Sequence, residues 1–205
     1  MQFQLPQQSK VDKFIAKTKF SAYGNVPYKI KQEFTDKIQK ITWRYKLAES
    51  TINISPTDQV EEIQIFEIEL KEKEIPKKVL SVIDKTIPYP ILYVFVYQSN
   101  TAYGITLKDD IKQRYYFSDW NENLHFEFSG TNLEQVSQKI IRVFVEKDQK
   151  TDADFKTLIS KDILKEKLTR EISALENKIK NEKQFKKQVE LHKELQIKKQ
   201  QLANL

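Results

Sequence analysis

The residues that could most readily take part in a reaction are three carboxylates and a lysine around one apolar segment. Glu67, Glu69 and Lys71 alternate at the end of the run IQIFEIELK, and Asp58 precedes that run. Carboxylate oxygens bind Mg²⁺ well, and a lysine can position and polarise the attacking water. An Asp ahead of a strand that ends in Glu-x-Lys is typical of metal-dependent nucleases. Asp58, Glu69 and Lys71 are therefore candidate catalytic residues, and Asp58, Glu67 and Glu69 are candidate metal ligands.

A second interpretation of the same residues remains open. Glu and Lys are among the commonest residues of the chain, Glu-x-Lys is a short pattern, and no separate strand is evident around Asp58. In this interpretation the charges mark a strand end that meets solvent, with Glu69 paired to Lys71. No cofactor is expected, and Mg²⁺ is expected only under the nuclease hypothesis.

The composition excludes several other kinds of site. Three glycines in 205 residues leave no glycine-rich phosphate loop and no dinucleotide motif. The absence of cysteine excludes disulfides, thiolate zinc sites and a cysteine nucleophile. The two histidines, His125 and His192, are too few for a histidine-rich metal site, and we interpret His125 as structural.

Two aromatic clusters resemble nucleic-acid surfaces in composition. One is the run WRYK at residues 43–46, and the other combines Trp120 with Tyr103, Tyr115 and Tyr116. Aromatic rings stack on bases, and cations bind phosphates. However, successive residues of a helix point in different directions, so residues 43 and 45 would not form one platform. Packing in the core or within strands accounts for both clusters more simply.

The first half of the body is predicted from its apolar spacing. The stretch after Pro27 has apolar residues three and four positions apart, which predicts one amphipathic helix. They are Ile30, Phe34, Ile38, Ile41 and Tyr45. Residues 60–70 predict an interior strand, because apolar residues occur on both of its faces. One face has Gln64, Phe66, Ile68 and Leu70, and the other has Ile63, Ile65, Glu67 and Glu69. Residues 74–86 predict a helix, which Pro88 and Pro90 end.

The second half predicts more strands and a closing helix. ILYVFVY and AYGITL are expected to form a hairpin, and RYYF and LHFEF two further strands. Thr131 and Glu134 have the spacing of a capping box ahead of a helix. The expected fold class is α+β, a mixed β-sheet packed with helices. We expect a basic arm at residues 1–24, this body at 25–150 and a helical tail at 151–205.

The tail is predicted to be a long helix. No glycine or proline interrupts the last 44 residues, and Leu168, Ile172, Leu175 and Ile179 step as a coiled-coil seam does. A second leucine set, Leu191, Leu195, Leu202 and Leu205, is out of register with the first, so an antiparallel hairpin that turns near Asn181 is the alternative. We favour the continuous helix, whose seam would need a partner such as a second copy.

Charge and hydropathy indicate the compartment and the kinds of partner to expect. Residues 161–205 hold 12 of the 35 Lys and Arg residues but only 7 of the 29 Asp and Glu residues. Such a basic tail suits DNA or an acidic protein surface, or it is a solvated helix kept soluble by its lysines. No run of 18 apolar residues and no signal peptide is evident, so we expect a cytoplasmic protein without a membrane partner.

Several segments together resemble a known family. They are KTKF, ITWRYKLAESTINI, EEIQIFEIELKEKEI, IDKTIPYPILYVF and KQFKKQVELHKEL. The chain resembles the DUF4391 family, a bacterial and archaeal domain of unknown function, over most of its length. Genes of that family often lie beside restriction-type helicases and DNA methyltransferases. The resemblance therefore implies a role in defence against foreign DNA, and it supplies no catalytic residues.

Three classes of function follow. The leading hypothesis is an accessory subunit of a restriction-like anti-phage system, which binds DNA or a partner and assembles through its tail with a helicase, a methyltransferase or itself. The alternative is a divergent Mg²⁺-dependent nuclease. The third is an inhibitor or structural protein that acts only through protein contacts, and it would show no salt-dependent DNA affinity.

Overall fold

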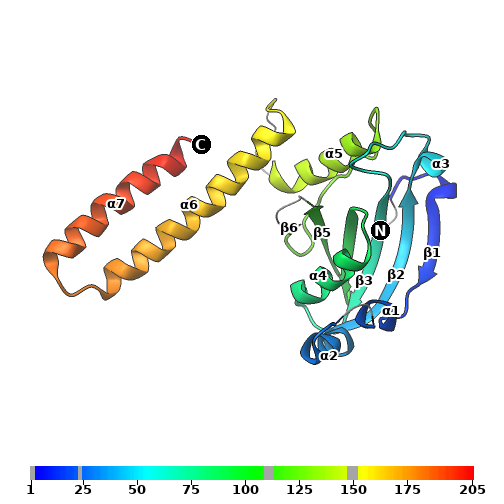
Figure 1. The fold of residues 1–205 in the computed structure, drawn as a ribbon, viewed down its shortest axis with the longest axis horizontal. Helices are drawn as coiled ribbons and strands as arrows, with labels where there is room; N and C mark the ends of the chain where they lie inside the picture. Colours follow the sequence, from blue (N-terminus) through cyan, green and yellow to red (C-terminus); the bar gives the residue numbers. More distant parts are fainter. Residues whose placement is uncertain (1–2, 23–24, 109–112, 147–151) are drawn as a thin grey trace. The chain divides into compact units, whose positions relative to one another are not determined.

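A computed structural model of the chain describes residues 3–22, 25–108, 113–146 and 152–205. The chain folds as two compact units, Met1–Lys147 and Asp148–Leu205. The first is an α+β body, and the second is a pair of helices (Figure 1).

The body is built on one six-stranded mixed sheet with the order β1-β2-β3-β4-β5-β6. Its strands are β1 (Lys10–Phe14), β2 (Ile38–Leu47), β3 (Ile63–Leu70), β4 (Ile91–Tyr97), β5 (Asn100–Lys108) and β6 (Gln113–Phe117). Neighbours are antiparallel except β3 and β4, which are parallel. Helix α4 (Lys77–Thr86) connects that parallel pair. The expected α+β class and the interior position of β3 are both confirmed.

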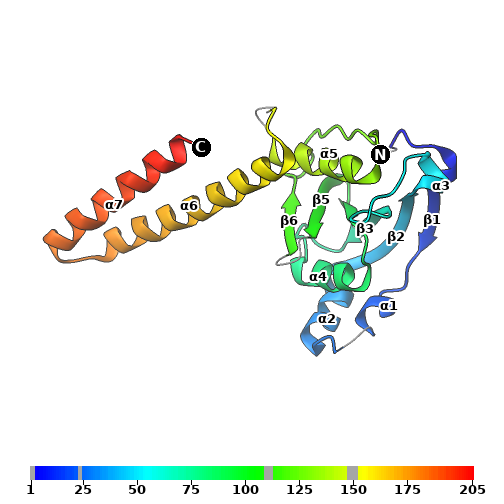
Figure 2. The ribbon, with the colours of Figure 1, turned by 45° about the horizontal axis from the view of Figure 1, so that its top comes forward.

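Helices α1 (Thr18–Ser21), α2 (Tyr28–Lys37) and α4 cover one face of the sheet (Figures 1 and 2). The core on this face joins apolar residues of these helices to residues of β2, β3 and β4. Its largest members are Phe20, Phe34, Phe66, Tyr93 and Phe95. The N-terminal segment, predicted as a basic arm, contributes the short helix η1 (Gln7–Ser9), the edge strand β1 and α1. It is thus part of the folded sheet.

The opposite face is covered in part by α5 (Leu133–Val145) (Figure 2). The predicted cap is wrong by one residue, because Asn132 rather than Thr131 accepts the hydrogen bond from the backbone N–H of Gln135, at 2.9 Å. The strand predicted at LHFEF is also wrong, since this segment forms no strand. The ring of Phe126 packs between Tyr103 and Phe144 instead.

The helix predicted from Pro27 to Tyr45 is correct only in its first part. Helix α2 ends at Lys37 and β2 begins at Ile38. The physical reason is a bulge: the register of β2 on β3 shifts between Ile38 and Lys40, so Ile38 and Ile41 both face the helix-covered core. A bulge adds one residue to a strand, so a spacing of three falls on one face and imitates a helix. The short helix α3 (Glu49–Ile52) follows β2.

The second unit is an antiparallel helical hairpin of α6 (Phe155–Asn181) and α7 (Phe185–Ala203). The favoured continuous helix is therefore wrong, and the alternative turn near Asn181 is confirmed. Leu168, Ile172 and Leu175 are buried, and the latter two pack against Leu195 of α7. The second leucine set thus covers the seam of the first. Among the described residues, no helix combines the length and apolar character that a membrane span needs.

Candidate functional site

The charged residues around β3 lie on the sheet face that α5 covers only in part. Glu67 and Glu69 have Thr42 and Lys40 as their Cα partners on β2, and Val94 and Val96 on β4. Their side chains alternate with those of Phe66 and Ile68, which enter the core under α4. We call Lys10, Asp12, Lys40, Arg44, Glu67 and Glu69 the charged sheet face.

Ion pairs join these residues across three strands. Arg44 Nη2 lies 2.6 Å from Glu67 Oε1, and Arg44 Nη1 lies 3.0 Å from Asp12 Oδ1. Lys10 Nζ lies 3.0 Å from the other oxygen of Asp12. Hydrogen bonds from Lys10 and Arg44 hold the pKa of Asp12 below its usual value, and the bond to Glu67 raises the pKa of Arg44. Each carboxylate here has a cationic partner.

Backbone irregularities place the two central members of this network. Arg44 lies at a second register shift of β2, between Trp43 and Tyr45. Asp12 lies at the register shift of β1 and has a φ of 47°, in the left-handed region. A bulge redirects the side chain of the inserted residue. Together they line a cavity of about 310 Å³ with Glu67 and Thr101.

The sequence-predicted metal site is not assembled in this arrangement. Asp58 lies in the loop before β3, where the hydroxyl of the adjacent Thr57 donates to Glu134 of α5 at 3.3 Å. Glu69 lies near the far end of β3, about 20 Å beyond its first residue at roughly 3.3 Å per residue. In the described parts of the chain, no group of three or more His, Cys, Asp or Glu residues could hold a metal. As arranged, Asp58, Glu67 and Glu69 do not fit Mg²⁺.

Glu69 and Lys71 form neither the predicted metal-dependent site nor the alternative ion pair with each other. Glu69 lies 3.5 Å from Lys40 Nζ on the neighbouring strand. Lys71 follows the end of β3, where its backbone N–H donates to the carbonyl of Lys37 at 2.9 Å. The nuclease hypothesis stays a prediction, now without a preformed ligand set.

A buried polar cluster around Asp84 was missed by sequence reasoning. Asp84 of α4 is 3% exposed and accepts hydrogen bonds from Tyr93 at 3.0 Å, Thr106 at 2.9 Å and Tyr115 at 2.5 Å. Burial raises the pKa of Asp84, and it also raises the pKa values of both tyrosines. The available signal was a lone carboxylate beside Ile83 on the apolar face of a predicted helix.

Lys108 completes this cluster at the end of α4. Its ammonium donates to the backbone carbonyls of Asp84 at 3.1 Å, of Tyr89 at 2.7 Å and of Ile87. Burial lowers the pKa of Lys108. Terminal helix carbonyls lack partners within the helix, and a cation there is favourable. The cluster therefore ties α4 to β4, β5 and β6.

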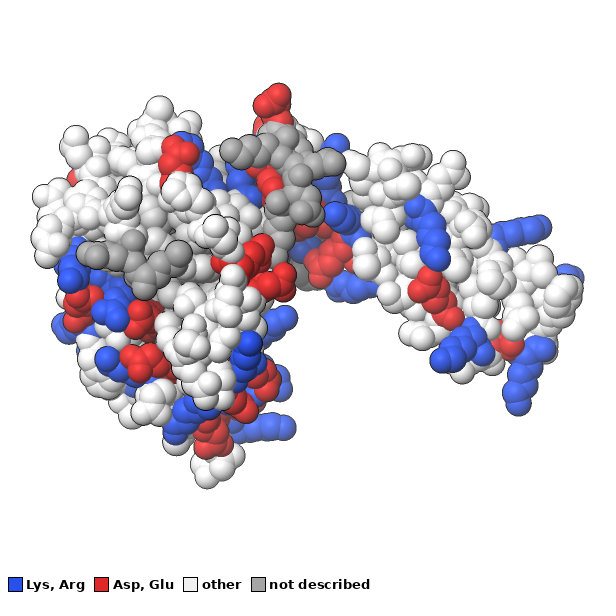
Figure 3. Space-filling view, turned by 180° about the vertical axis from the view of Figure 1, so that it is seen from behind, with Lys and Arg blue, Asp and Glu red and all other residues white. Residues whose placement is uncertain are grey.

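The hairpin carries a concentration of cations at its turn. Five exposed lysines and one glutamate, Glu182, lie within residues 178–187. We call Lys178, Lys180, Lys183, Lys186 and Lys187 the turn-end lysines. Over the described residues, no ion pair involves any of them. Figure 3 shows cationic side chains projecting from this end of the hairpin, where Phe185 is 80% exposed.

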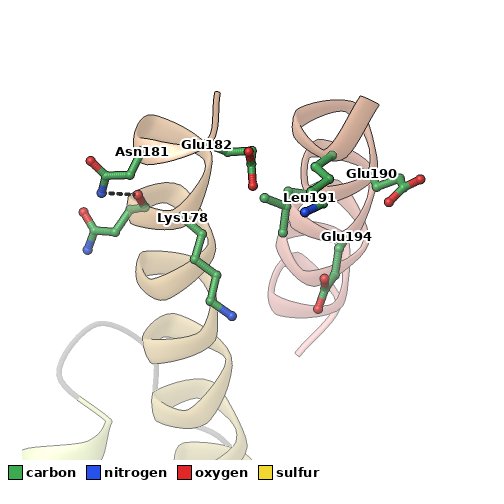
Figure 4. A pocket seen from close by; sticks show the side chains of 8 residues that line it. Lys178, Asn181, Glu182, Glu190, Leu191 and Glu194 are labelled. Atoms are coloured by element: carbon green, nitrogen blue, oxygen red, sulfur yellow. Dashed lines mark hydrogen bonds between the residues drawn. The ribbon is translucent and has the colours of Figure 1, made fainter. Parts of the chain in front are cut away.

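A groove of about 690 Å³ lies between α6 and α7 near the same turn. Figure 4 shows Lys178 on its α6 side and Glu190, Leu191 and Glu194 on its α7 side. The groove is thus mixed in charge, and the excess of lysine lies on the exterior around the turn.

Comparison with known proteins assigns a family. The model of a domain of unknown function, DUF4391, matches residues 3–202. The chain belongs to the DUF4391 family. Searches of curated proteins and of solved structures found no match. The DUF4391 match includes residues of both units.

Proposed function

We propose that this DUF4391 protein is an accessory, non-catalytic subunit of a bacterial restriction-like anti-phage defence system. It binds DNA or a partner subunit in the cytoplasm and assembles through its helical tail. The observation that carries this proposal is the hairpin, a separate compact unit whose exposed turn end is strongly basic.

The packing of the hairpin indicates which surface makes the contact. Ile172, Leu175 and Leu195 pack with Ile179, Leu191 and Leu202, so the leucine seam is buried within one chain. A partner therefore meets the exterior of the hairpin, which carries the turn-end lysines. Unpaired lysines on a helical surface suit the phosphates of DNA, or an acidic face of a helicase, a methyltransferase or a second copy.

The charged sheet face supports binding rather than catalysis. Arg44 and Lys40 neutralise Glu67 and Glu69, so these carboxylates are already partnered. A metal ion would have to displace both cations. This face therefore suits recognition of a polar protein surface.

DNA affinity measured as a function of salt tests the proposal. Lysine contacts to phosphate release condensed counterions, so we expect the logarithm of the association constant to fall linearly with the logarithm of salt concentration. The measurement is fluorescence anisotropy of a labelled duplex with the full chain. A chain that binds no DNA at low salt, and no helicase or methyltransferase subunit encoded beside it, would overturn the proposal.

The nuclease hypothesis has a separate test. If Asp58, Glu69 and Lys71 form a site once DNA and Mg²⁺ are bound, Glu69→Ala and Lys71→Ala should each abolish plasmid nicking. Glu69 is partly exposed and Lys71 is exposed, so the unfolding midpoints should stay close to that of the wild type. Under our proposal, neither the wild type nor the variants nick the plasmid. Equal nicking by all three proteins would eliminate these residues.

A further inference from the structure

A second basic surface lies in the body, where α4 begins. A groove of about 570 Å³ is lined by Lys73, Lys77 and Lys78 together with the rings of Phe117 and Trp120. Lys37, Glu33 and Glu74 complete its charged lining. We call this the lysine–aromatic groove.

Two of the lysines lie over the aromatic rings. Lys73 Nζ is 5.6 Å from the centroid of Trp120, and Lys77 Nζ is 5.2 Å from the centroid of Phe117. These are cation–π distances. Both rings are half-buried and pack on the core beneath α4. The rings are therefore held in place, and lysine side chains cover their outer sides.

The positive charge of the groove is only partly neutralised. Lys37 Nζ lies 2.9 Å from Glu74 and 3.6 Å from Glu72. By contrast, Lys73, Lys77 and Lys78 form no ion pair with a carboxylate of the described chain. Lys73 donates only to the amide oxygen of Asn100, at 3.2 Å. Three cations thus remain available to an anion.

The first turn of α4 disfavours two of these lysines. Lys77 and Lys78 are the first two residues of α4, which has no acidic residue in its first turn and no side-chain cap. Cations in the first turn oppose the helix dipole. Residues that act against local stability are often found at functional sites. An anion in the groove would remove this unfavourable interaction.

We propose that the lysine–aromatic groove binds one nucleotide unit of a single-stranded nucleic acid. The base stacks on Trp120 and displaces the ammonium of Lys73, which moves to the adjoining phosphate. Lys77 and Lys78 hold the same or the next phosphate. Stacking on an aromatic ring combined with cations along the backbone is the general mode of single-strand binding. This inference rests on the proposed nucleic-acid function and adds the body site at which a strand is held.

The fluorescence of Trp120 provides a direct readout. The chain has two tryptophans, so Trp43→Phe leaves Trp120 as the sole reporter. We expect a thymidine oligonucleotide to quench its emission. Trp120→Leu, in an otherwise unchanged chain, should weaken strand affinity roughly 5- to 150-fold, the usual contribution of one stacked base. The double variant Lys77→Gln/Lys78→Gln should reduce the slope of log association constant against log salt by about 1.4, at about 0.7 for each contact with a phosphate of a single strand.

A matched variant controls for charge alone. Lys156→Gln/Lys165→Gln removes two exposed lysines of α6 and should leave Trp120 quenching unchanged. Wild-type affinity in both Trp120→Leu and Lys77→Gln/Lys78→Gln, with no quenching, would overturn this inference while DNA binding by the chain still supports the proposed function. A chain that binds neither strand nor duplex would overturn both. Equal quenching by thymidine monophosphate would overturn a strand as the ligand and assign the groove to free nucleotides.

Discussion

Asp84→Ala should lower the free energy of unfolding of the body by about 3–5 kcal/mol, because three hydroxyl groups, two of them almost fully buried, lose their shared acceptor. Each unsatisfied buried group costs about 1–3 kcal/mol, and neighbouring losses do not add fully. Tyr93 and Thr106 are almost fully buried, so water cannot readily replace the carboxylate. Urea denaturation followed by tryptophan emission measures the effect, since Trp43 and Trp120 both lie in the body.

Asp58→Ala is the matched control for this change. Asp58 is exposed in the loop before β3, so its loss should change stability by less than about 0.5 kcal/mol. A comparably small change for Asp84→Ala would show that the buried cluster is not a stabilising element.

The stability of the wild type and that of Asp84→Ala should depend differently on pH. Burial raises the pKa of Asp84, so the folded state binds this proton more tightly than the unfolded state does. The contribution of Asp84 to the free energy of unfolding is then fully present below the pKa that this residue has in the unfolded chain. It is partly lost as pH rises through the pKa of Asp84 in the folded protein. The difference in unfolding free energy between wild type and Asp84→Ala should therefore be larger near pH 4 than near pH 7. A difference that grows with pH would contradict a raised pKa.

Most of the sheet could be predicted because its signals are local. β3, β4 and β5 are short apolar runs bounded by turn residues, and the prolines at positions 88 and 90 separate α4 from β4. Within β3, alternation also assigned Phe66 and Ile68 to one face and Glu67 and Glu69 to the other, as the structure shows. The alternation of side chains between the two faces of a strand can be read from the sequence without knowing which strand pairs with it.

Features that depend on distant partners could not be predicted. The bulge at Ile38 produced a helix-like spacing inside a strand. Phe126 and Phe128 resemble strand residues, but the rings of Phe3, Tyr103 and Phe144 give them a place to pack outside the sheet. Tertiary packing overrides intrinsic strand propensity in such cases.

The candidate site shows the same limit. The nuclease hypothesis requires Asp58 and Glu69 to converge, which sequence spacing leaves open, whereas the register of β2 on β3 places Lys40 and Arg44 beside the two glutamates. Arg44 pairs with Glu67 of the neighbouring strand from a position beside a bulge, and no local pattern of residues encodes that pairing. The hairpin turn was available as an alternative because the leucine sets are out of register, a property visible within the tail alone.

Replacing Lys180, Lys183 and Lys186 with Gln should weaken duplex DNA binding by on the order of 100-fold at low salt and reduce the salt slope by about 2–3, if each lysine contacts one phosphate. The three lysines are exposed and form no ion pair over the described residues, so the variant should retain its helical circular dichroism. Anisotropy titrations at several salt concentrations measure both the affinity and the slope.

The matched control for the turn end is Lys156→Gln/Lys165→Gln/Lys193→Gln, which removes the same charge from exposed positions elsewhere on the hairpin. If the turn-end lysines contact phosphates, the slope of log association constant against log salt should fall in the turn-end variant and stay nearly unchanged in the control. The reason is that counterion release depends on the number of phosphate contacts rather than on net charge. Equal losses in both variants would instead indicate diffuse attraction by the whole tail. Unchanged binding in both would place the DNA contact on the body, where the lysine–aromatic groove is the next surface to vary.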